Sequence, residues 1–196
     1  MIKLGIFLEC DSELKDKIKK IKALFISKEK KQKYLEHPVH MTFYVFNTQI
    51  KDIKEICKKL DAISKKNYPF KISINKWRVF ENDILTHLNT LCLDIEKSDD
   101  LMKLQLDIGE SLINLHEENN QVFDGVFKKA NKRYGYPFIG SHWIPHITIG
   151  SIDMPVNEIL KNSNDSFIFP RELIIDNLSL YKIEDDTHQL LYKIDF

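Results

Sequence analysis

The chain has 196 residues, of which 43% are hydrophobic, and it carries 29 basic and 29 acidic residues. This length suffices for one sizeable core, and no stretch rich in proline, glycine or serine divides it, so we expect a single domain over residues 1–196. The balanced charge excludes the global basic surface of proteins that coat long nucleic acids. Any nucleic-acid partner should therefore be short or held locally.

The cysteines and the apolar segments indicate the compartment. Cys10, Cys57 and Cys92 lie in apolar segments without paired spacing, and their odd number argues against a disulfide framework. We therefore expect free thiols in a reducing compartment, the cytoplasm. The N-terminal apolar stretch is short and followed by charge, which is typical of a first strand and not of a signal peptide. No apolar segment approaches the roughly 18 residues of a membrane span, so we expect no membrane partner.

The first third of the chain alternates between strand and helix patterns. Residues 2–9 read as a strand, and Asp11 or Ser12 is a candidate N-cap for the helix that follows. That helix carries apolar residues at helical spacing: Leu14, Ile18, Ile21 and Phe25. A charged, proline-broken segment, 27–38, leads into the strand-like run VHMTFYVF, and residues 50–65 predict a second helix with one apolar face.

The remainder predicts two strands, a helix, an irregular segment and a closing set of strands. Residues 69–80 and 84–96 are suited to strands joined by a turn at 81–83, and Ser98 is a candidate cap for an amphipathic helix to about Leu115. Residues 117–143 are long, polar and aromatic, and we expect a loop or lid there, with a turn of helix near 125–130. The run PHITIGSI, a short helix near 156–161 and two tail strands, 167–183 and 189–196, complete the chain.

Two short segments carry the same polar pair in strand-like surroundings. They are His40-Met41-Thr42 and His146-Ile147-Thr148. On a strand, residues two apart point to the same face, so each segment presents an imidazole and a hydroxyl side by side. An imidazole exchanges protons near neutral pH, and a hydroxyl can hold a phosphate oxygen. Two facing pairs would supply an acid, a base and two phosphate-binding groups.

A single histidine in a strand is more often structural than catalytic, so each motif alone is weak evidence. Of the seven histidines, however, only His40 and His146 are followed at the second position by serine or threonine. A polar pair on a half-buried strand costs free energy unless it is hydrogen-bonded or lines a cleft. The repetition therefore favours a shared cleft.

The repeated pair, about a hundred residues apart, with a closing strand run ELIIDNLSLYKIE, resembles the 2H phosphoesterase superfamily, which includes 2′-5′ RNA ligase (LigT-like) proteins and cyclic nucleotide phosphodiesterases. The specific match is confined to VHMTFYVF and WIPHITIGSI, while the first strand and the tail agree in order. The resemblance implies an α+β, bilobal fold with two pseudo-symmetric lobes of antiparallel sheet, helices outside and a central groove. The connection between the motifs is longer than in compact members, a difference that bears on the choice of substrate more than on the chemistry.

The resemblance also assigns roles to residues and names a reaction. His40 and His146 would be the catalytic pair, and Thr42 and Thr148 would bind the phosphate. The expected activity is that of a metal-independent phosphodiesterase, without a cofactor, acting on 2′,3′-cyclic phosphates or on 2′-5′- or 3′-5′-linked, including cyclic, oligonucleotides. Its partners would be a nucleotide, a cyclic oligonucleotide or a short RNA, and we expect a monomer.

Substrate contacts are expected near the second motif. Tyr136, Phe138 and Trp143 could stack on a base, although packing under the long connection explains them equally well. Lys132 and Arg133, with the lysine-rich stretch 28–33, could attract phosphates, although such runs are usually solvated surface.

Rival interpretations are a metal enzyme and a binding module. His37 with His40, or His142 with His146, has ligand-like spacing, but no carboxylate or cysteine cluster completes a site. Histidine-triad hydrolases are disfavoured because HITIG lacks their alternating histidines. A non-catalytic module could use the same groove to bind a nucleotide or RNA end. Among enzymes, RNA-end processing and degradation of a signalling nucleotide both stay open.

Overall fold

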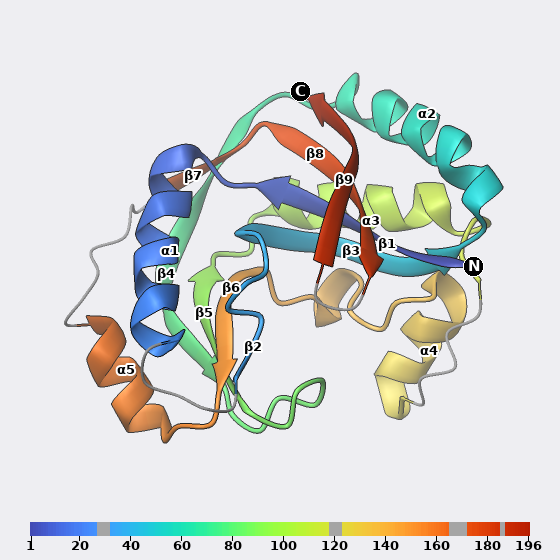
Figure 1. Cartoon of the computed structure of the whole chain (residues 1–196). Helices are drawn as coiled ribbons and strands as arrows, with labels where there is room; N and C mark the ends of the chain where they lie inside the picture. The colour runs from blue at the N-terminus through green and yellow to red at the C-terminus, as the bar shows by residue number, and fades with distance from the viewer. Residues whose placement is uncertain (27–31, 118–122, 165–171, 185–186) are drawn as a thin grey trace.

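The computed structural model describes residues 1–26, 32–117, 123–164, 172–184 and 187–196, which form a curved sheet flanked by helices (Figure 1). The strands are β1 (Ile2–Glu9), β2 (Gln32–Lys33), β3 (His40–Thr48), β4 (Phe70–Phe80), β5 (Asn89–Ile95), β6 (His146–Ile152), β7 (Glu172–Ile175), β8 (Asn177–Glu184) and β9 (Thr187–Asp195). The α-helices are α1 (Ser12–Ile26), α2 (Ile53–Ser64), α3 (Asp99–Leu112), α4 (Gly125–Tyr134) and α5 (Val156–Asn164). Two 3₁₀ turns span Ile50–Asp52 and Gly140–His142.

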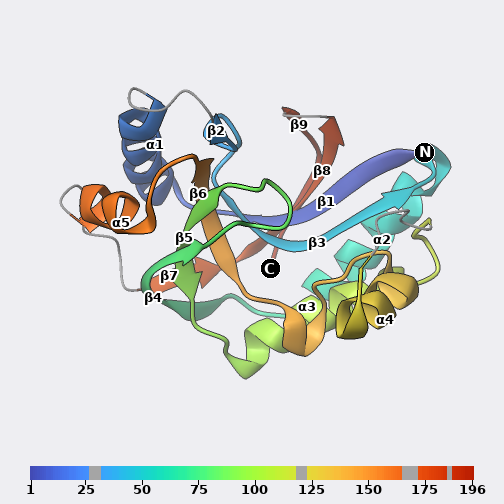
Figure 2. The same cartoon turned by 90° about the horizontal axis from the view of Figure 1, so that it is seen from below.

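The described strands form an antiparallel sheet in the order β7-β4-β5-β6-β3-β1-β8-β9, with β2 paired to β6. β3 and β6 pair only between Met41 and Ile147 in the described part of the chain. Figure 2 shows β1 and β3 running at a steep angle to β5 and β6, so the sheet divides at this pair into two lobes. The predicted fold class, an α+β fold with two antiparallel lobes and helices outside, is confirmed.

The helices α1, α2 and α3 form where the apolar spacing predicts them, and each has a row of buried residues along one face. In α1, Leu14, Ile18, Ile21 and Phe25 are each at most 1% exposed. Burying one such side chain contributes about 1.5–3 kcal/mol to the stability of the folded protein. α3 begins at the predicted cap, where the Ser98 hydroxyl accepts a hydrogen bond from the Leu101 amide at 3.2 Å.

Two segments differ from their predicted secondary structure. The strand expected from residue 84 begins only at Asn89, because 81–88 form a loop in which Asn82 and His87 have positive φ. The segment expected to be a loop or lid, 117–143, contains α4 over ten residues, which ends at the left-handed Gly135 and packs against α3. Residues 118–122 lie outside the described part, and the lid role stays a prediction.

The tail also differs, since the strand run expected over 167–183 is two strands. β7 pairs with β4 in one lobe, whereas β8 pairs with β1 in the other. The break at Asp176 therefore carries the chain from one lobe to the other. Residues 167–171 of the predicted strand lie outside the described part.

Candidate active site

The two His-x-Thr motifs occupy equivalent places in the two lobes, since His40 begins β3 and His146 begins β6. Continuing the antiparallel register of Met41 and Ile147 by one residue each way places each histidine beside the threonine of the other motif. Directly opposed residues share a face of the sheet, as do residues two apart, so all four polar side chains share one face. The histidines are then diagonal neighbours, whose usual Cα separation is about 7–8 Å.

Both imidazoles are held by the same backbone hydrogen bond. Nδ1 of His40 lies 2.8 Å from the Pro38 carbonyl oxygen, and Nδ1 of His146 lies 2.7 Å from that of Ile144. A carbonyl only accepts, so Nδ1 carries the hydrogen in each ring. The neutral imidazole then has its lone pair on Nε2, which is the tautomer that a proton acceptor needs.

An aromatic ring packs against each histidine from a neighbouring part of the same lobe. Phe7 of β1 stacks on His40 with 3.9 Å between ring centroids, and Phe80 of β4 meets His146 edge-on at 5.1 Å. Gly5 makes the first contact possible, since a Cβ there would lie 2.2 Å from the Phe7 ring. Both imidazoles are half-buried and held in place.

The electrostatic surroundings of His40 oppose its protonation. Burial is the largest cause and lowers its pKa to about 3, and the neighbouring His188 acts in the same direction. Lys22 and His37 lower it further, while the backbone hydrogen bond to Pro38 raises it. His40 is therefore neutral over the physiological pH range.

His146 has different neighbours. Burial is the largest cause and leaves the pKa of His146 below its ordinary value. The hydrogen bond to Ile144 and the carboxylates of Asp83 and Asp94 act in the raising direction, and Arg78 lowers the pKa further. Carboxylates favour a protonated imidazole, whereas cationic groups oppose it. The two histidines are thus alike in geometry and unlike in charge environment.

Each histidine lies opposite an acidic residue on the neighbouring strand of its own lobe. Glu9 of β1 is the Cα partner of His40, and Asp94 of β5 is the partner of His146. Both carboxylates contact cations, Lys15 for Glu9 at 3.0 Å and Arg78 for Asp94 at 2.6 Å. No pattern in the sequence singles out Glu9 or Asp94, because their position beside the histidines depends on which strands pair.

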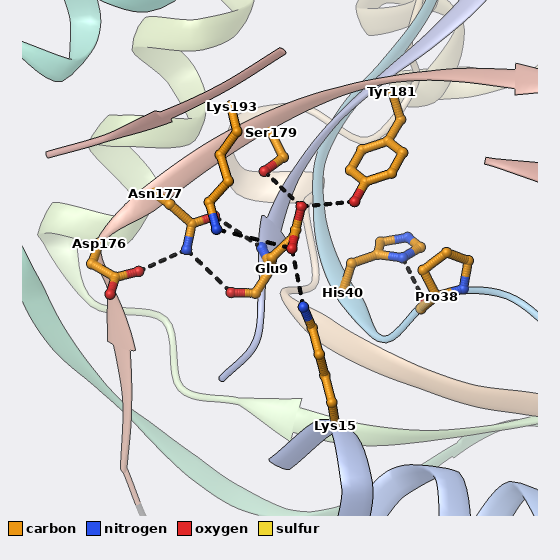
Figure 3. Close-up of polar contacts among 9 residues, drawn as sticks. All are labelled: Glu9, Lys15, Pro38, His40, Asp176, Asn177, Ser179, Tyr181 and Lys193. Carbon is orange, nitrogen blue, oxygen red and sulfur yellow. Dashed lines mark hydrogen bonds and ion pairs between the residues drawn. The ribbon is translucent and has the colours of Figure 1, made fainter. Parts of the chain in front are cut away.

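Figure 3 shows the Glu9 carboxylate surrounded by donors. The hydroxyls of Tyr181 and Ser179 donate to it at 2.7 and 3.1 Å, and the Lys193 ammonium lies 4.0 Å away. Burial is the largest single influence on the pKa of Glu9 and raises it, but the Tyr181 hydrogen bond and the cations together lower it. Glu9 is thus an ionised residue that fixes Tyr181, whose ring contacts Phe7 at 5.5 Å.

The predicted base-stacking residues lie in the packed segment around α4. Trp143 is 3% exposed, and its Nε1 donates to the Thr42 carbonyl at 3.0 Å. Its indole supports β3 from within the core and offers no face to a ligand. Tyr136 packs edge-on against Tyr44 at 5.7 Å, on the strand that carries Thr42, and against Phe138 at 5.5 Å.

The predicted cationic residues that the structure describes lie on α4 and β2. Arg133 is exposed and forms two hydrogen bonds with Glu110 of α3, at 2.9 and 3.0 Å. Lys132 is exposed on α4, and Lys33 is exposed on β2. Residues 28–31 of the lysine-rich stretch lie outside the described part.

The positions of the histidines bear on the metal interpretation. The rings of His37 and His40 lie near His188, at 4.5 and 5.5 Å between centroids, while His142 contacts Phe127 at 5.6 Å. Across residues 1–196 outside the four undescribed gaps, no group of three or more histidine, cysteine or acidic side chains is arranged to hold a metal ion.

No helix in the described part is long and apolar enough to cross a membrane.

The chain matches one protein-family model, and its fold is similar to that of several solved structures. The family model described as the 2′-5′ RNA ligase superfamily matches residues 10–187. TT0787 of Thermus thermophilus superposes with a TM-score of 0.70 at 13% identity, covering 99% of this chain and 97% of that one. LigT of E. coli in complex with 3′-AMP gives a TM-score of 0.59 at 11% identity, with coverage of 99% and 97%. Usb1 of Kluyveromyces marxianus gives 0.50 at 10% identity, with coverage of 98% and 96%. No match was found among curated protein sequences.

Proposed function

The chain belongs to the 2′-5′ RNA ligase superfamily, and from this we propose that it is a metal-independent phosphodiesterase. It would act on 2′,3′-cyclic phosphates or on 2′-5′- or 3′-5′-linked oligonucleotides, including cyclic ones, by acid-base catalysis with two histidines. One observation carries the proposal. The pairing of Met41 with Ile147 puts two imidazoles, each beside a hydroxyl, on one face of the sheet.

In-line attack on phosphorus requires a proton to leave the incoming oxygen and another to reach the leaving oxygen on the opposite side. Two histidines in diagonal positions can flank a phosphate and serve both ends. The Thr42 and Thr148 hydroxyls would donate hydrogen bonds to the non-bridging oxygens, where negative charge accumulates.

The charge environment leads us to assign different roles to the histidines in hydrolysis. His40, beside His188, Lys22 and His37, would be the general base, taking a proton from water at Nε2. His146, beside the carboxylates of Asp83 and Asp94, would be the general acid, protonating the oxygen that leaves phosphorus. In the reverse reaction, ligation, the roles exchange.

Support for a nucleotide substrate comes from the fold relatives. LigT of E. coli, whose fold this chain shares, has been crystallised with phosphate and with 3′-AMP. The balanced charge of the present chain, 29 basic against 29 acidic residues, favours a small or short substrate over long RNA.

The test is a substrate panel in the presence of a chelator. Purified protein is incubated with 2′,3′-cyclic nucleotides and with short 2′-5′- and 3′-5′-linked oligonucleotides, and products are separated by chromatography. Turnover that persists in the chelator and disappears in His40→Ala is the expected result. Binding without turnover, measured by calorimetry on the same panel, would favour the non-catalytic binding module. Turnover only after a divalent metal is restored would contradict the two-histidine mechanism.

A further inference from the structure

Arg78 lies in the same cross-strand row as the second motif. It is the Cα partner of Cys92, which is in turn the partner of Thr148, so the three residues form a row across β4, β5 and β6. Directly opposed residues share a face of the sheet, so Arg78 belongs to the face that carries the histidines. Two strand spacings separate its Cα from that of Thr148 by about 10 Å. An extended arginine side chain spans a large part of this interval.

The guanidinium of Arg78 is held in a defined orientation. Its Nε donates to Oδ1 of Asp94 at 2.6 Å, and the Asp94 side chain is only 8% exposed. Its Cζ lies 5.8 Å from the centre of the Phe80 ring, which itself contacts His146. Arg78 therefore contacts two residues, Asp94 and Phe80, that are themselves neighbours of His146.

The Nη atoms of Arg78 make no hydrogen bond within the described part of the chain, although the side chain is 36% exposed. A guanidinium has five donors, and Asp94 engages one of them. The edge formed by the two Nη atoms matches the spacing of two phosphate oxygens.

The other lobe has no comparable group among the described residues around Glu9. The two cations beside Glu9, Lys15 and Lys193, are both directed at its carboxylate, at 3.0 and 4.0 Å, as Figure 3 shows. Tyr181 also donates to Glu9. Lys22, whose charge also acts on His40, donates to the backbone carbonyls of Tyr34 and His37 at 3.0 and 2.7 Å. Among the cations described here, Arg78 on the β4 side, next to His146, therefore offers an edge of donors to a ligand.

We propose that Arg78 binds a second phosphate group of the substrate, adjacent to the phosphate that reacts between the two histidines, and that Asp94 positions its guanidinium. This inference rests on the proposed function and narrows the substrate class. The preferred substrate carries a phosphate on the 5′ side of the reacting nucleotide, either as a terminal 5′-phosphate or as an internucleotide linkage.

Three substrates test this proposal. They are adenosine 2′,3′-cyclic phosphate, the same nucleotide with a 5′-phosphate, and an ApA dinucleotide that ends in a 2′,3′-cyclic phosphate. Arg78→Ala should lower kcat/KM at least tenfold more on the substrates with two phosphates than on the one with a single phosphate. If kcat/KM falls more on both two-phosphate substrates than on the single-phosphate one, Arg78 recognises the phosphate group itself. If it falls more only on the dinucleotide, Arg78 recognises the internucleotide linkage.

Two further variants complete the design. Arg78→Lys keeps a cation beside the buried Asp94 and should show the same difference at smaller size, which covers the case in which Arg78→Ala does not fold. Lys71→Ala removes a cation from the same strand, where Lys71 pairs with Glu172 at 2.8 Å, and should leave all three rates unchanged. KM for the dinucleotide should also depend less steeply on salt concentration in Arg78→Ala than in the wild type, because one screened charge pair is lost.

An equal loss on all three substrates, or no loss, would overturn the assignment of Arg78. A wild-type protein that cleaves none of them would contradict the proposed activity instead. In that event binding of 3′-AMP and of ApA with a 3′-phosphate, measured by calorimetry, still tests Arg78. Arg78→Ala should raise the Kd of the second ligand by tenfold or more and leave the Kd of 3′-AMP unchanged. An equal rise in both Kd values would reject the proposal.

Discussion

Met41 of β3 lies opposite Ile147 of β6, and this single antiparallel pair joins the two lobes in the described part of the chain. Both side chains are fully buried. Their burial keeps the strands in register, and the residues on either side of each then point to the opposite face. The spatial relation between the two His-x-Thr motifs therefore depends on apolar packing that neither motif contains.

Replacing either of the two histidines proposed as acid and base should remove activity without removing the fold. General acid-base catalysis contributes about 10²–10⁴ in rate, so His40→Ala and His146→Ala should each lower kcat by at least a hundredfold. His87→Asn, in the exposed loop 81–88, is the control, since asparagine tolerates the positive φ found there. Circular dichroism should show an unchanged fold. Activity near the wild-type level in either folded alanine variant would refute the mechanism.

Loss of a threonine hydroxyl should cost less than loss of a histidine. Thr42→Val and Thr148→Val keep the side-chain shape and remove one hydrogen bond to the charged phosphate, so we expect kcat/KM to fall about 10- to 100-fold. The path of the protons is intact in both variants, so the pH profile of kcat should keep its shape. A change in that profile as large as in the histidine variants would argue against a role limited to phosphate binding.

Gly5 should matter for catalysis although it lies on β1, outside both His-x-Thr motifs. A Cβ at this position would lie 2.2 Å from Cζ of Phe7, whose ring stacks on His40. Gly5→Ala must therefore displace the Phe7 ring, and we expect kcat to fall about tenfold or more. Phe7→Leu, which removes the stacking ring and keeps an apolar side chain, should act in the same direction. Wild-type kcat in both variants would show that the ring does not position His40.

Trp143→Phe should lower stability more than it changes substrate choice. The variant keeps an aromatic ring in the core but leaves the Thr42 carbonyl without its indole donor, which lies at 3.0 Å. An unsatisfied buried carbonyl costs about 1–3 kcal/mol. Thermal unfolding should show a Tm lower by several degrees, since each kcal/mol shifts Tm by about 2–4 °C at this size. Altered relative rates over the substrate panel, with Tm unchanged, would instead support base stacking.

Stability should depend on pH through His40. Its pKa is about 3 in the folded protein, against an ordinary value of 6.5, so the unfolded chain binds more protons between these values. The contribution to stability is present above pH 6.5 and is lost as the pH falls toward 3. His40→Gln should therefore show a smaller loss of unfolding free energy than the wild type between pH 7.5 and 5, measured with urea. Equal losses in the two proteins would contradict the lowered pKa.

Local patterns were sufficient for several elements and for the two motifs. Apolar spacing predicted α1 and α3, and the cap at Ser98 is where its residue type indicates, because capping and amphipathicity are properties of neighbouring residues. The His-x-Thr repeats could be read in the same way, since side chains two apart on a strand share a face. The division of the tail run into β7 and β8 could not, because the two strands pair with different lobes.

The order of residues alone was enough to place two imidazole-hydroxyl pairs on strands within an α+β fold. What surrounds them depends on the folded arrangement: Phe7 and Glu9 beside His40, and Phe80, Asp94 and Arg78 beside His146. These neighbours come from strand pairing over long sequence separations, and that pairing is set by how the whole sheet buries its apolar face. The same packing places Trp143 in the core, because its indole meets a backbone carbonyl of β3.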